Sequence, residues 1–239
     1  MQKHEERPVC FLNAGRISYL NGLTLQDYFH KKVAQDGHAP VVLLMEHDPV
    51  YTLGKHATRS NILGSPQWLS ERNIDVIQTE RGGQVTAHMP GQLVIYPILN
   101  LPDHGFSVKS WVCLLEESTI RVLKRYDIHA HRDSDHPGVW IGQKKIAAIG
   151  IRIKKRTSCH GIAINIDTDP DLFDGLIPCG IKDRGVVNLS NFVQSGVSLN
   201  KVAKEWLEEF SLMMQKTGRP VGLKECVRPD PFDMPELEN

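Results

Sequence analysis

The chain has 239 residues, of which 41% are hydrophobic and 23% are charged, and its 28 basic residues balance its 28 acidic ones. These proportions are ordinary for a globular protein, and the length suits one sizeable domain or two small ones. Because the formal net charge is zero, neither nucleic acid nor an anionic membrane is expected as the main partner. No apolar run approaches the ~18 residues that a membrane-spanning helix requires, and the first ten residues lack the apolar segment of a secretory signal.

The spacing of hydrophobic residues predicts strands and helices that are interleaved along the first hundred residues. In chain order we predict an amphipathic helix at 23–35, strands at 41–47 and 50–54, a helix at 65–72, a strand at 75–80, and an apolar strand at 92–101. Pro97 has no N–H to donate, so the second half of that last strand is expected at a sheet edge or a bulge.

The second half of the chain continues with the most regular helix, which Ser107 is placed to cap. The predicted elements are this helix at 107–127, short strands at 138–142, 145–153 and 160–166, and a second long helix at 198–218. Together they predict one α/β (or α+β) domain with a mixed sheet flanked by helices. The domain is expected to span 1–218, followed by a loose tail over 219–239.

The sequence contains five cysteines, which are odd in number and scattered: Cys10, Cys113, Cys159, Cys179 and Cys226. This distribution does not resemble a disulfide framework and favours a reducing compartment. Cys179 differs from the others because it lies between Pro178 and Gly180, in a short loop that follows an apolar run. A nucleophilic cysteine needs a nearby cation or base, and the candidates are Lys144, Lys145, His88 and His160. Local sequence alone leaves the catalytic and the structural interpretation of Cys179 open.

Two other features are compatible with a ligand site. The stretch RGGQVTAHMPGQ (81–92) is rich in glycine and polar residues, yet it matches neither the phosphate-binding loop nor the dinucleotide-binding fingerprint. In the strands around 148 and 163, bulky residues occupy one face, which belongs in a core, and small residues occupy the other. The small faces predict either a closely packed helix or a groove for an extended apolar ligand.

The stretch HAHRDSDH (129–136) raises the possibility of a metal site, because three histidines and two aspartates are close in sequence. It contains neither an HExxH motif nor paired CxxC motifs. We therefore expect no metal here and interpret the stretch as a surface loop.

Several of these segments, in this order, resemble the lipoyl(octanoyl) transferase family. The segments that carry the resemblance are EHDPVYTLGKHA, RGGQVTAHMPGQLVIYPI, GVWIGQKKIAAIGIRI, HGIAINI and LIPCGI, and the similarity runs from about residue 10 to 215. The resemblance implies the fold of biotin and lipoate protein ligases. It implies transfer of an octanoyl (or lipoyl) group from acyl carrier protein to a lysine of lipoyl domains, through an acyl-cysteine thioester.

By the same resemblance, Cys179 is the nucleophile, Lys145 is the acid/base, and no cofactor or metal is required. The implied substrate-binding residues are Arg81, Gly82, Gly83, Gln84, Val85, Thr86, Ala87, His88, Ala148, Ile149, Gly150, Gly161, Ile162 and Ala163. Strict strand alternation would instead turn Lys144 toward the face of Ala148. The chain also departs from the family at Ala87, usually aromatic, and at Met89, usually glycine, which is expected to affect chain-length preference or partner docking.

The implied acceptors are the lipoyl domains of 2-oxoacid dehydrogenase complexes and the glycine cleavage H protein, and a monomer is expected. The expected compartment is mitochondrial for a eukaryotic source and cytoplasmic otherwise. Two alternatives stay open: an ATP-dependent lipoate or biotin ligase, and a non-catalytic protein that binds acyl groups or lipoyl domains.

Overall fold

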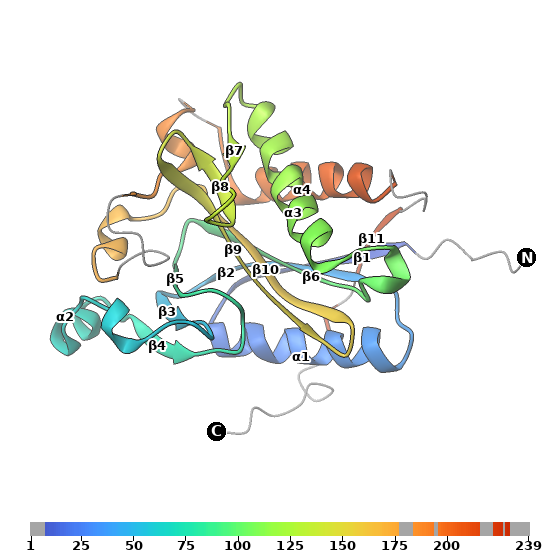
Figure 1. The fold of residues 1–239 in the computed structure, drawn as a ribbon, viewed down its shortest axis with the longest axis horizontal. Coiled ribbons are helices and arrows are strands. Elements are labelled where there is room, and N and C mark those ends of the chain that lie inside the picture. Colours follow the sequence, from blue (N-terminus) through green and yellow to red (C-terminus); the bar gives the residue numbers. More distant parts are fainter. Residues whose placement is uncertain (1–7, 177–183, 194–195, 216–221, 227, 230–239) are drawn as a thin grey trace, which may run out of the picture.

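The computed structural model describes residues 8–176, 184–193, 196–215, 222–226 and 228–229. Most of its strands form one eight-stranded mixed sheet (Figure 1). In spatial order these strands are β11 (Leu223–Glu225), β1 (Val9–Ile17), β2 (Val41–His47), β6 (Gln92–Ile98), β10 (Thr157–Asn165), β9 (Lys144–Lys154), β8 (Gly138–Ile141) and β7 (His131–Arg132). A second sheet of three strands contains β4 (Asp75–Gln78), β3 (Val50–Leu53) and β5 (Val85–His88).

Helices cover both faces of the large sheet, so the fold has three layers (Figure 1). The helices are α1 (Tyr19–Gln35), α2 (Pro66–Glu71), α3 (Val108–Lys124) and α4 (Leu199–Gln215). On one face, α3 and α4 form the larger core with the strands, and Trp206 of α4 donates from Nε1 to Thr119 Oγ1 of α3 at 3.0 Å. On the other face, Leu25 and Phe29 of α1 pack on the sheet in a second core. The predicted mixed sheet flanked by helices is therefore confirmed.

Local sequence signals account for where the helices begin. Ser18, Ser65 and Ser107 each cap a helix, and their side chains accept backbone N–H groups of the first turn. α1 begins at Tyr19, four residues before the predicted start, where Ser18 caps it by accepting the N–H of Asn21.

The pairing of β8 with β9 contains a bulge that sets the direction of the side chains in β9. Val139 pairs with Ala147 and Trp140 pairs with Lys145, so Ile146 is an extra residue without a partner in β8. Ile146 and Ala147, although adjacent, both lie in the larger core. A bulge inserts one residue and reverses the alternation beyond it, so Lys145 takes the sheet face that Lys144 would occupy in a regular strand.

Three sequence-based expectations differ from the structure. Pro97 was expected at an edge or bulge, but β6 is an interior strand; its ladder with β10 ends at Ile95, so Pro97 need not donate to that ladder. Residues 223–225 were expected in the loose tail, but they form β11. Val9 N–H donates to Gly222 O at 2.9 Å, because the exposed edge of β1 offers unpaired backbone groups to the returning chain.

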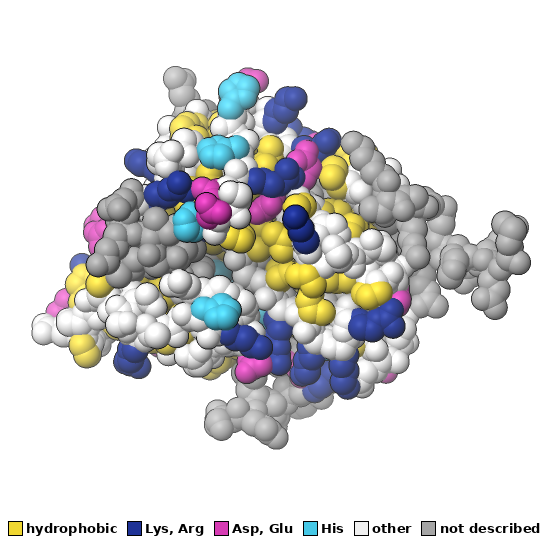
Figure 2. Space-filling model, in the orientation of Figure 1, with side chains coloured by type: hydrophobic (Ala, Val, Ile, Leu, Met, Phe, Trp, Pro, Cys, Tyr) yellow, Lys and Arg dark blue, Asp and Glu magenta, His cyan; other side chains and the backbone are white. Residues whose placement is uncertain are grey.

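The third difference concerns the bulky face of β9. Ile149, Ile151 and Ile153 pack against the larger core but stay half-buried, whereas Ile162 and Ile164 of β10 are fully buried. Figure 2 shows hydrophobic side chains at the surface in the middle of this face, where β9 runs in Figure 1, with lysine and arginine side chains gathered toward the β9–β10 hairpin and α1.

Over the described residues, none of the helices has the length and apolar character needed to cross a membrane.

Gly161 is the position in β10 where a side chain would be least tolerated. A Cβ built there would lie 2.2 Å from Ile95 O and 2.8 Å from Pro97 Cδ of the neighbouring strand. We expect Gly161→Ala to reduce the free energy of unfolding by about 1–3 kcal/mol, because the two strands must separate. Urea unfolding measures this. Gly185→Ala is the matched control, since its Cβ would meet nothing closer than 4.0 Å; equal losses in both variants would contradict the close approach of β6 and β10.

Candidate active site

Two pockets adjoin each other between the two sheets, and they share Thr86 and Ala148 as lining residues. The first, called here the tyrosine pocket, is partly open to solvent and has a cavity volume of about 20 Å³. Its lining residues are Tyr19, Arg81, Thr86, His88, Tyr96, Ala148, Ile149, Gly150, His160, Gly161, Ile162 and Ala163. The second, called the lysine pocket, is also partly open and has a cavity volume of about 30 Å³. Its lining residues are Val85, Thr86, Ala87, Gln92, Lys145, Ala148, Asn165, Phe173, Leu176 and Val186.

The tyrosine pocket lies on the small-residue face of β9 and β10. Gly150 pairs with Gly161 and Ala148 pairs with Ala163, so neighbouring strands present four small residues together. The same face of β10 also contacts α1, where Gln26 accepts the N–H of His160 through Oε1 at 2.8 Å. Both interpretations of the small face therefore hold: a helix packs on part of it, and a pocket occupies the part near Tyr19, where α1 begins.

Arg81 joins the glycine-rich stretch to the small sheet and forms part of the pocket wall. Its Nη2 donates to Thr52 O at 2.6 Å and its Nε to Thr52 Oγ1 at 3.1 Å, so most of the guanidinium is held by β3. The next residue, Gly82, donates its N–H to Ile151 O of β9 at 2.9 Å. These contacts fix the two sheets relative to each other at the mouth of the pocket.

A chain of hydrogen bonds orients His88 in the pocket wall. Its Nδ1–H donates to Gln92 Oε1 at 2.8 Å, and Gln92 Nε2 donates to Asn165 Oδ1 at 2.9 Å. An amide oxygen only accepts, so the proton of the neutral imidazole resides on Nδ1 and Nε2 is left as the acceptor. The ring also stacks against Tyr19, with the ring centroids 5.7 Å apart.

Three buried histidines around this pocket are held in the neutral form. Burial lowers the pKa of His47 to about 4 and that of His160 to about 3, and it holds the pKa of His88 well below its ordinary value. The nearby Arg81 cation lowers the pKa of His88 and His160 further. The pocket is thus an uncharged, mostly apolar space beside one fixed cation.

Lys145, rather than Lys144, faces the lysine pocket. Lys145 is 6% exposed, whereas Lys144 lies on the surface. The Lys145 ammonium donates to Pro137 O at 3.1 Å and lies 4.7 Å from the ring centroid of Trp140. The physical reason is the bulge at Ile146, which turns Lys145 to the face of Ala148.

Cys179 lies outside the described residues, but described residues before and after 177–183 line the lysine pocket. Leu176 and Val186 line the pocket together with Lys145. Beyond the segment, Lys145 N–H donates to Gly185 O at 3.0 Å, and Val187 N–H donates to Lys145 O at 3.1 Å. The chain that leaves the segment is therefore bonded to the backbone of Lys145 itself.

The other four cysteines are free thiols and are partly buried. Burial raises the pKa of the Cys159 thiol to about 11 and that of Cys226 to about 12. Since the thiolate is the reactive form, these values describe poor nucleophiles.

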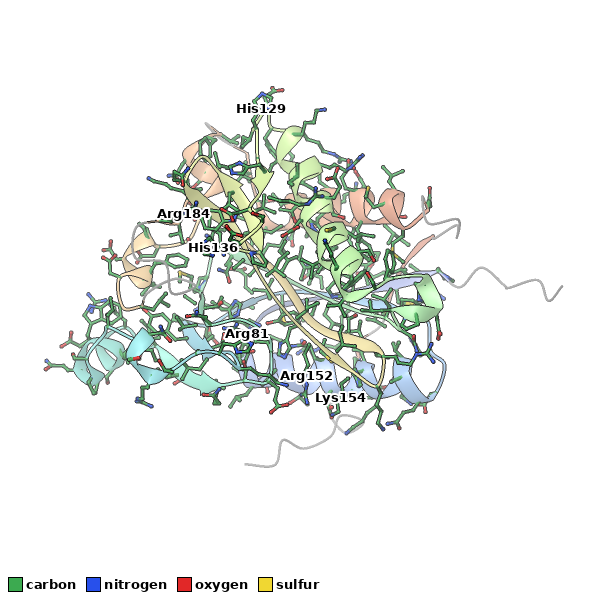
Figure 3. All side chains as sticks on the ribbon, in the orientation of Figure 1. Arg81, His129, His136, Arg152, Lys154 and Arg184 are labelled. Atoms are coloured by element: carbon green, nitrogen blue, oxygen red, sulfur yellow. The ribbon has the colours of Figure 1, made fainter. Side chains whose placement is uncertain are left out.

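The side chains of the stretch 129–136 form hydrogen bonds and an ion pair, and its three histidines do not come together as metal ligands would. Asp133 accepts the N–H groups of Asp135 and His136 and pairs with Arg184, which holds the pKa of its carboxyl well below the ordinary value. Figure 3 shows Arg184 and His136 close to each other above Arg81, with His129 far away at the top. Arg184 and His136 both pack on the ring of Trp140. Within the described ranges, no three His, Cys, Asp or Glu side chains lie close enough to hold a metal ion.

The structure brings together most of the residues expected to bind substrate. Gly82, Gly83 and Gln84 line neither pocket, since this turn carries the chain from Arg81 to β5. The sequence pattern does not predict that Tyr19 and Tyr96 line a pocket, because a residue at a helix start or in an interior strand has no local signal of one. His160, which the sequence offers as a candidate base for Cys179, lines the tyrosine pocket. Its backbone is left-handed, with φ of +56°.

The two departures from the family pattern have different environments. Ala87 lies in the wall of the lysine pocket, opposite Tyr51 in the neighbouring strand. Met89 is 1% exposed and packs in the core of the small sheet with Leu53 and Leu69. Ala87 is therefore in a position to affect a ligand of the lysine pocket, whereas Met89 fills the core behind it.

This three-layered fold is that of the catalytic domains of lipoate and biotin ligases. The chain superimposes on a lipoate-protein ligase A bound with ATP with a TM-score of 0.77 at 17% identity, covering 94% of this chain and 90% of that one. A bi-partite lipoate protein ligase from Thermoplasma acidophilum gives 0.76 at 16% identity (93% and 88% covered). The biotin protein ligase from Aquifex aeolicus gives 0.51 at 16% identity (90% and 71% covered).

Within that class, the sequence comparisons define the family. Residues 18–211 match the model of the lipoyl protein ligase A/B catalytic domain. The chain is 41% identical over 201 residues to an octanoyltransferase from Alkaliphilus metalliredigens, covering 84% of this chain and 92% of that protein. It is 38% identical over 211 residues to one from Caldicellulosiruptor bescii, covering 87% and 92%. The chain belongs to the lipoyl protein ligase A/B catalytic family, which confirms the resemblance seen in the sequence.

The buried histidines predict a loss of stability as the pH falls from about 6.5 to 4. In this range an unfolded histidine binds a proton that folded His47, with its pKa of about 4, does not bind; the free energy of unfolding therefore decreases by about 1.4 kcal/mol per pH unit for that residue. We expect His47→Gln to flatten the dependence by this amount, measured by urea unfolding at pH 7, 6 and 5. His129→Gln, at the exposed His129, controls for loss of a histidine, and an unchanged slope in His47→Gln would contradict the assignment.

Proposed function

We propose that this chain transfers an octanoyl group from acyl carrier protein to a lysine of a lipoyl domain, by way of a thioester on Cys179. The octanoyltransferases that align with 84% and 87% of the chain support the identity of the acyl group. The family match over residues 18–211 supports a role in protein lipoylation.

The observation that carries the proposal is the setting of Lys145 in the lysine pocket. This amine is buried, faces apolar walls, and is flanked by Leu176 and Val186, which stand on either side of the segment containing Cys179. A buried lysine beside a cysteine is suited to act as the base that activates the cysteine as a nucleophile. Only seven residues (177–183), Cys179 among them, separate Leu176 from Arg184, and this short span supports a reaction of Cys179 at the lysine pocket.

The proposed reaction has two steps in which Lys145 carries the protons. In the first, neutral Lys145 takes the proton of Cys179, the thiolate attacks the carbonyl carbon of the donor thioester, and the ammonium returns the proton to the leaving thiolate of the carrier. In the second, the acceptor lysine amine attacks the Cys179 thioester. Its extra proton passes to Lys145 and then to the released Cys179 thiolate. One thioester is broken and one is formed in the first step, so that step is close to isoenergetic.

The tyrosine pocket is proposed to hold the acyl chain. Its apolar floor of Ala148, Gly150, Gly161 and Ala163 suits a methylene chain, since these four residues have a methyl side chain or none. Thr86 and Ala148 belong to both pockets, so a chain attached beside Lys145 has a continuous path into the tyrosine pocket.

The broader assignment follows from the same proposal. We place the catalytic domain at 1–218, with β11 (Leu223–Glu225) joining its sheet from beyond that range, and propose that it acts as a monomer without a metal or cofactor. The acceptors are the lipoyl domains of 2-oxoacid dehydrogenase complexes and the glycine cleavage H protein. The compartment is mitochondrial in a eukaryotic source and cytoplasmic otherwise.

Intact mass spectrometry after mixing with octanoyl-acyl carrier protein tests the proposal. The wild-type protein should gain one octanoyl group, which hydroxylamine removes because thioesters are cleaved readily by that nucleophile. Cys179→Ser should gain no hydroxylamine-labile group, and Cys159→Ser is the matched control that should be acylated like the wild type.

Three results would overturn the proposal. An unmodified wild-type protein would favour a non-catalytic binding protein. Labelling that needs ATP and free octanoate would identify a ligase. Labelling that survives in Cys179→Ser as a labile thioester would assign the nucleophile elsewhere.

The bulge in β9 predicts which of two adjacent lysines is needed. Lys145→Met should slow acylation of Cys179 by about 100-fold or more, because a general base contributes about 10²–10⁴ in rate. Lys144→Met should have little effect, since Lys144 is exposed. Single-turnover acylation measured at saturating donor compares the two variants, and the reverse ranking would show that the lysine pocket is not the reaction site.

A further inference from the structure

Glu116 is a buried carboxylate behind the lysine pocket, and the reaction proposed above does not use it. It lies on α3 and is only 4% exposed. Its Oε1 accepts the N–H of Gly138 at 2.9 Å, and its Oε2 lies 3.2 Å from Arg132 Nε. Burial raises the pKa of Glu116, whereas the Gly138 N–H and the Arg132 and Lys145 cations oppose that change. An ionised group so deeply buried is costly, so its retention calls for a role.

The peptide bond that Glu116 holds is the one that Lys145 contacts. Gly138 N–H and Pro137 O are the two ends of one planar peptide unit. Glu116 accepts from the nitrogen end, and the Lys145 ammonium donates to the oxygen end at 3.1 Å. The direction of the Pro137 carbonyl, and hence the place of the Lys145 Nζ atom, depends on the hydrogen bond at the other end.

The conformational preferences of Gly138 do not by themselves fix the orientation of this peptide unit. Gly138 has φ of +136°, and a Cβ there would lie 2.6 Å from Ala147 O and 3.3 Å from Lys145 Cε. This conformation is open to glycine, which also has many alternatives available to it. The buried N–H of Gly138 needs an acceptor, and Glu116 Oε1 supplies it.

We propose that Glu116 is a positioning residue for Lys145, acting through the Pro137–Gly138 peptide. It fixes the carbonyl that holds the Lys145 amine in the pocket beside Trp140. The inference rests on the proposed function in so far as Lys145 is the acid/base of acyl transfer. It assigns a function to α3, which otherwise serves only the core.

Three variants of Glu116 separate geometry from charge. Glu116→Gln keeps an oxygen that accepts from Gly138 but removes the charge. Glu116→Asp keeps the charge but withdraws the carboxylate by one methylene, and Glu116→Leu removes both. Glu117→Gln is the matched control, because Glu117 is the neighbouring partner of Arg132 and does not contact Gly138.

Acylation of Cys179 at saturating and subsaturating octanoyl-acyl carrier protein provides the rates. We expect Glu116→Gln and Glu117→Gln to stay within about threefold of the wild-type kcat, and Glu116→Leu to lose about 10- to 100-fold with KM unchanged. Glu116→Asp should fall between them, and it decides the question if Glu116→Leu fails to fold. Equal losses in the Gln and Leu variants, or a Gln variant slower than the Asp variant, would overturn positioning through the peptide.

NMR of the same variants tests the inference without octanoyl transfer. The Gly138 amide proton should be protected from exchange in the wild type and in Glu116→Gln, and should exchange about tenfold faster or more in Glu116→Leu and Glu116→Asp. The Lys145 methylene resonances, shifted by the Trp140 ring, should change in the same two variants. If the wild-type protein is not acylated, the proposed function fails while these signals still decide the role of Glu116; unchanged signals in all variants would overturn it.

Discussion

One extra residue in β9 determines which of two adjacent lysine side chains faces the lysine pocket. The bulge at Ile146 allows two consecutive residues, Ile146 and Ala147, to enter the core. As a result Lys145, instead of Lys144, lies in a pocket on the opposite face. The contacts of the Lys145 amine follow from that reversal: it lies over the ring of Trp140 and donates a hydrogen bond to the carbonyl oxygen of Pro137. Without the bulge, strand alternation would turn Lys144 to the pocket face and Lys145 to the face of Ala147.

The second constraint is the small-residue face shared by β9 and β10. Glycine and alanine at paired positions lower the surface of the sheet, and α1 covers only part of the depression. The remaining space is bounded by Arg81, whose guanidinium is committed to Thr52, and by neutral histidines. Burial keeps the histidines uncharged, so Arg81 is the charged side chain among the lining residues of the tyrosine pocket.

Sequence predicted the elements well where periodicity or a cap was clear, as in α3 with Ser107 or β2 at residues 41–47. It also predicted the small faces, but it could not choose between a helix and a pocket, since that depends on where α1 begins in space. The expectation for Pro97 was wrong because proline is excluded from interior strands only where its missing N–H would have to donate to a neighbouring strand. The ladder between β6 and β10 ends at Ile95, before Pro97. β11 was missed because a three-residue strand paired through backbone groups has no side-chain signature. Lys145 was preferred by family motif against strand parity, and the bulge supplies the physical reason.

The hydrogen bonds between the backbone of Lys145 and residues 185 and 187 have a consequence for how such a protein changes over time. They join β9, which carries Lys145, to the chain that leaves the Cys179 segment, and they use main-chain atoms only. Substitutions at the surrounding surface therefore leave this connection intact, provided that the backbone keeps its course. Side chains on the outer face of the site can therefore be exchanged without removing either hydrogen bond.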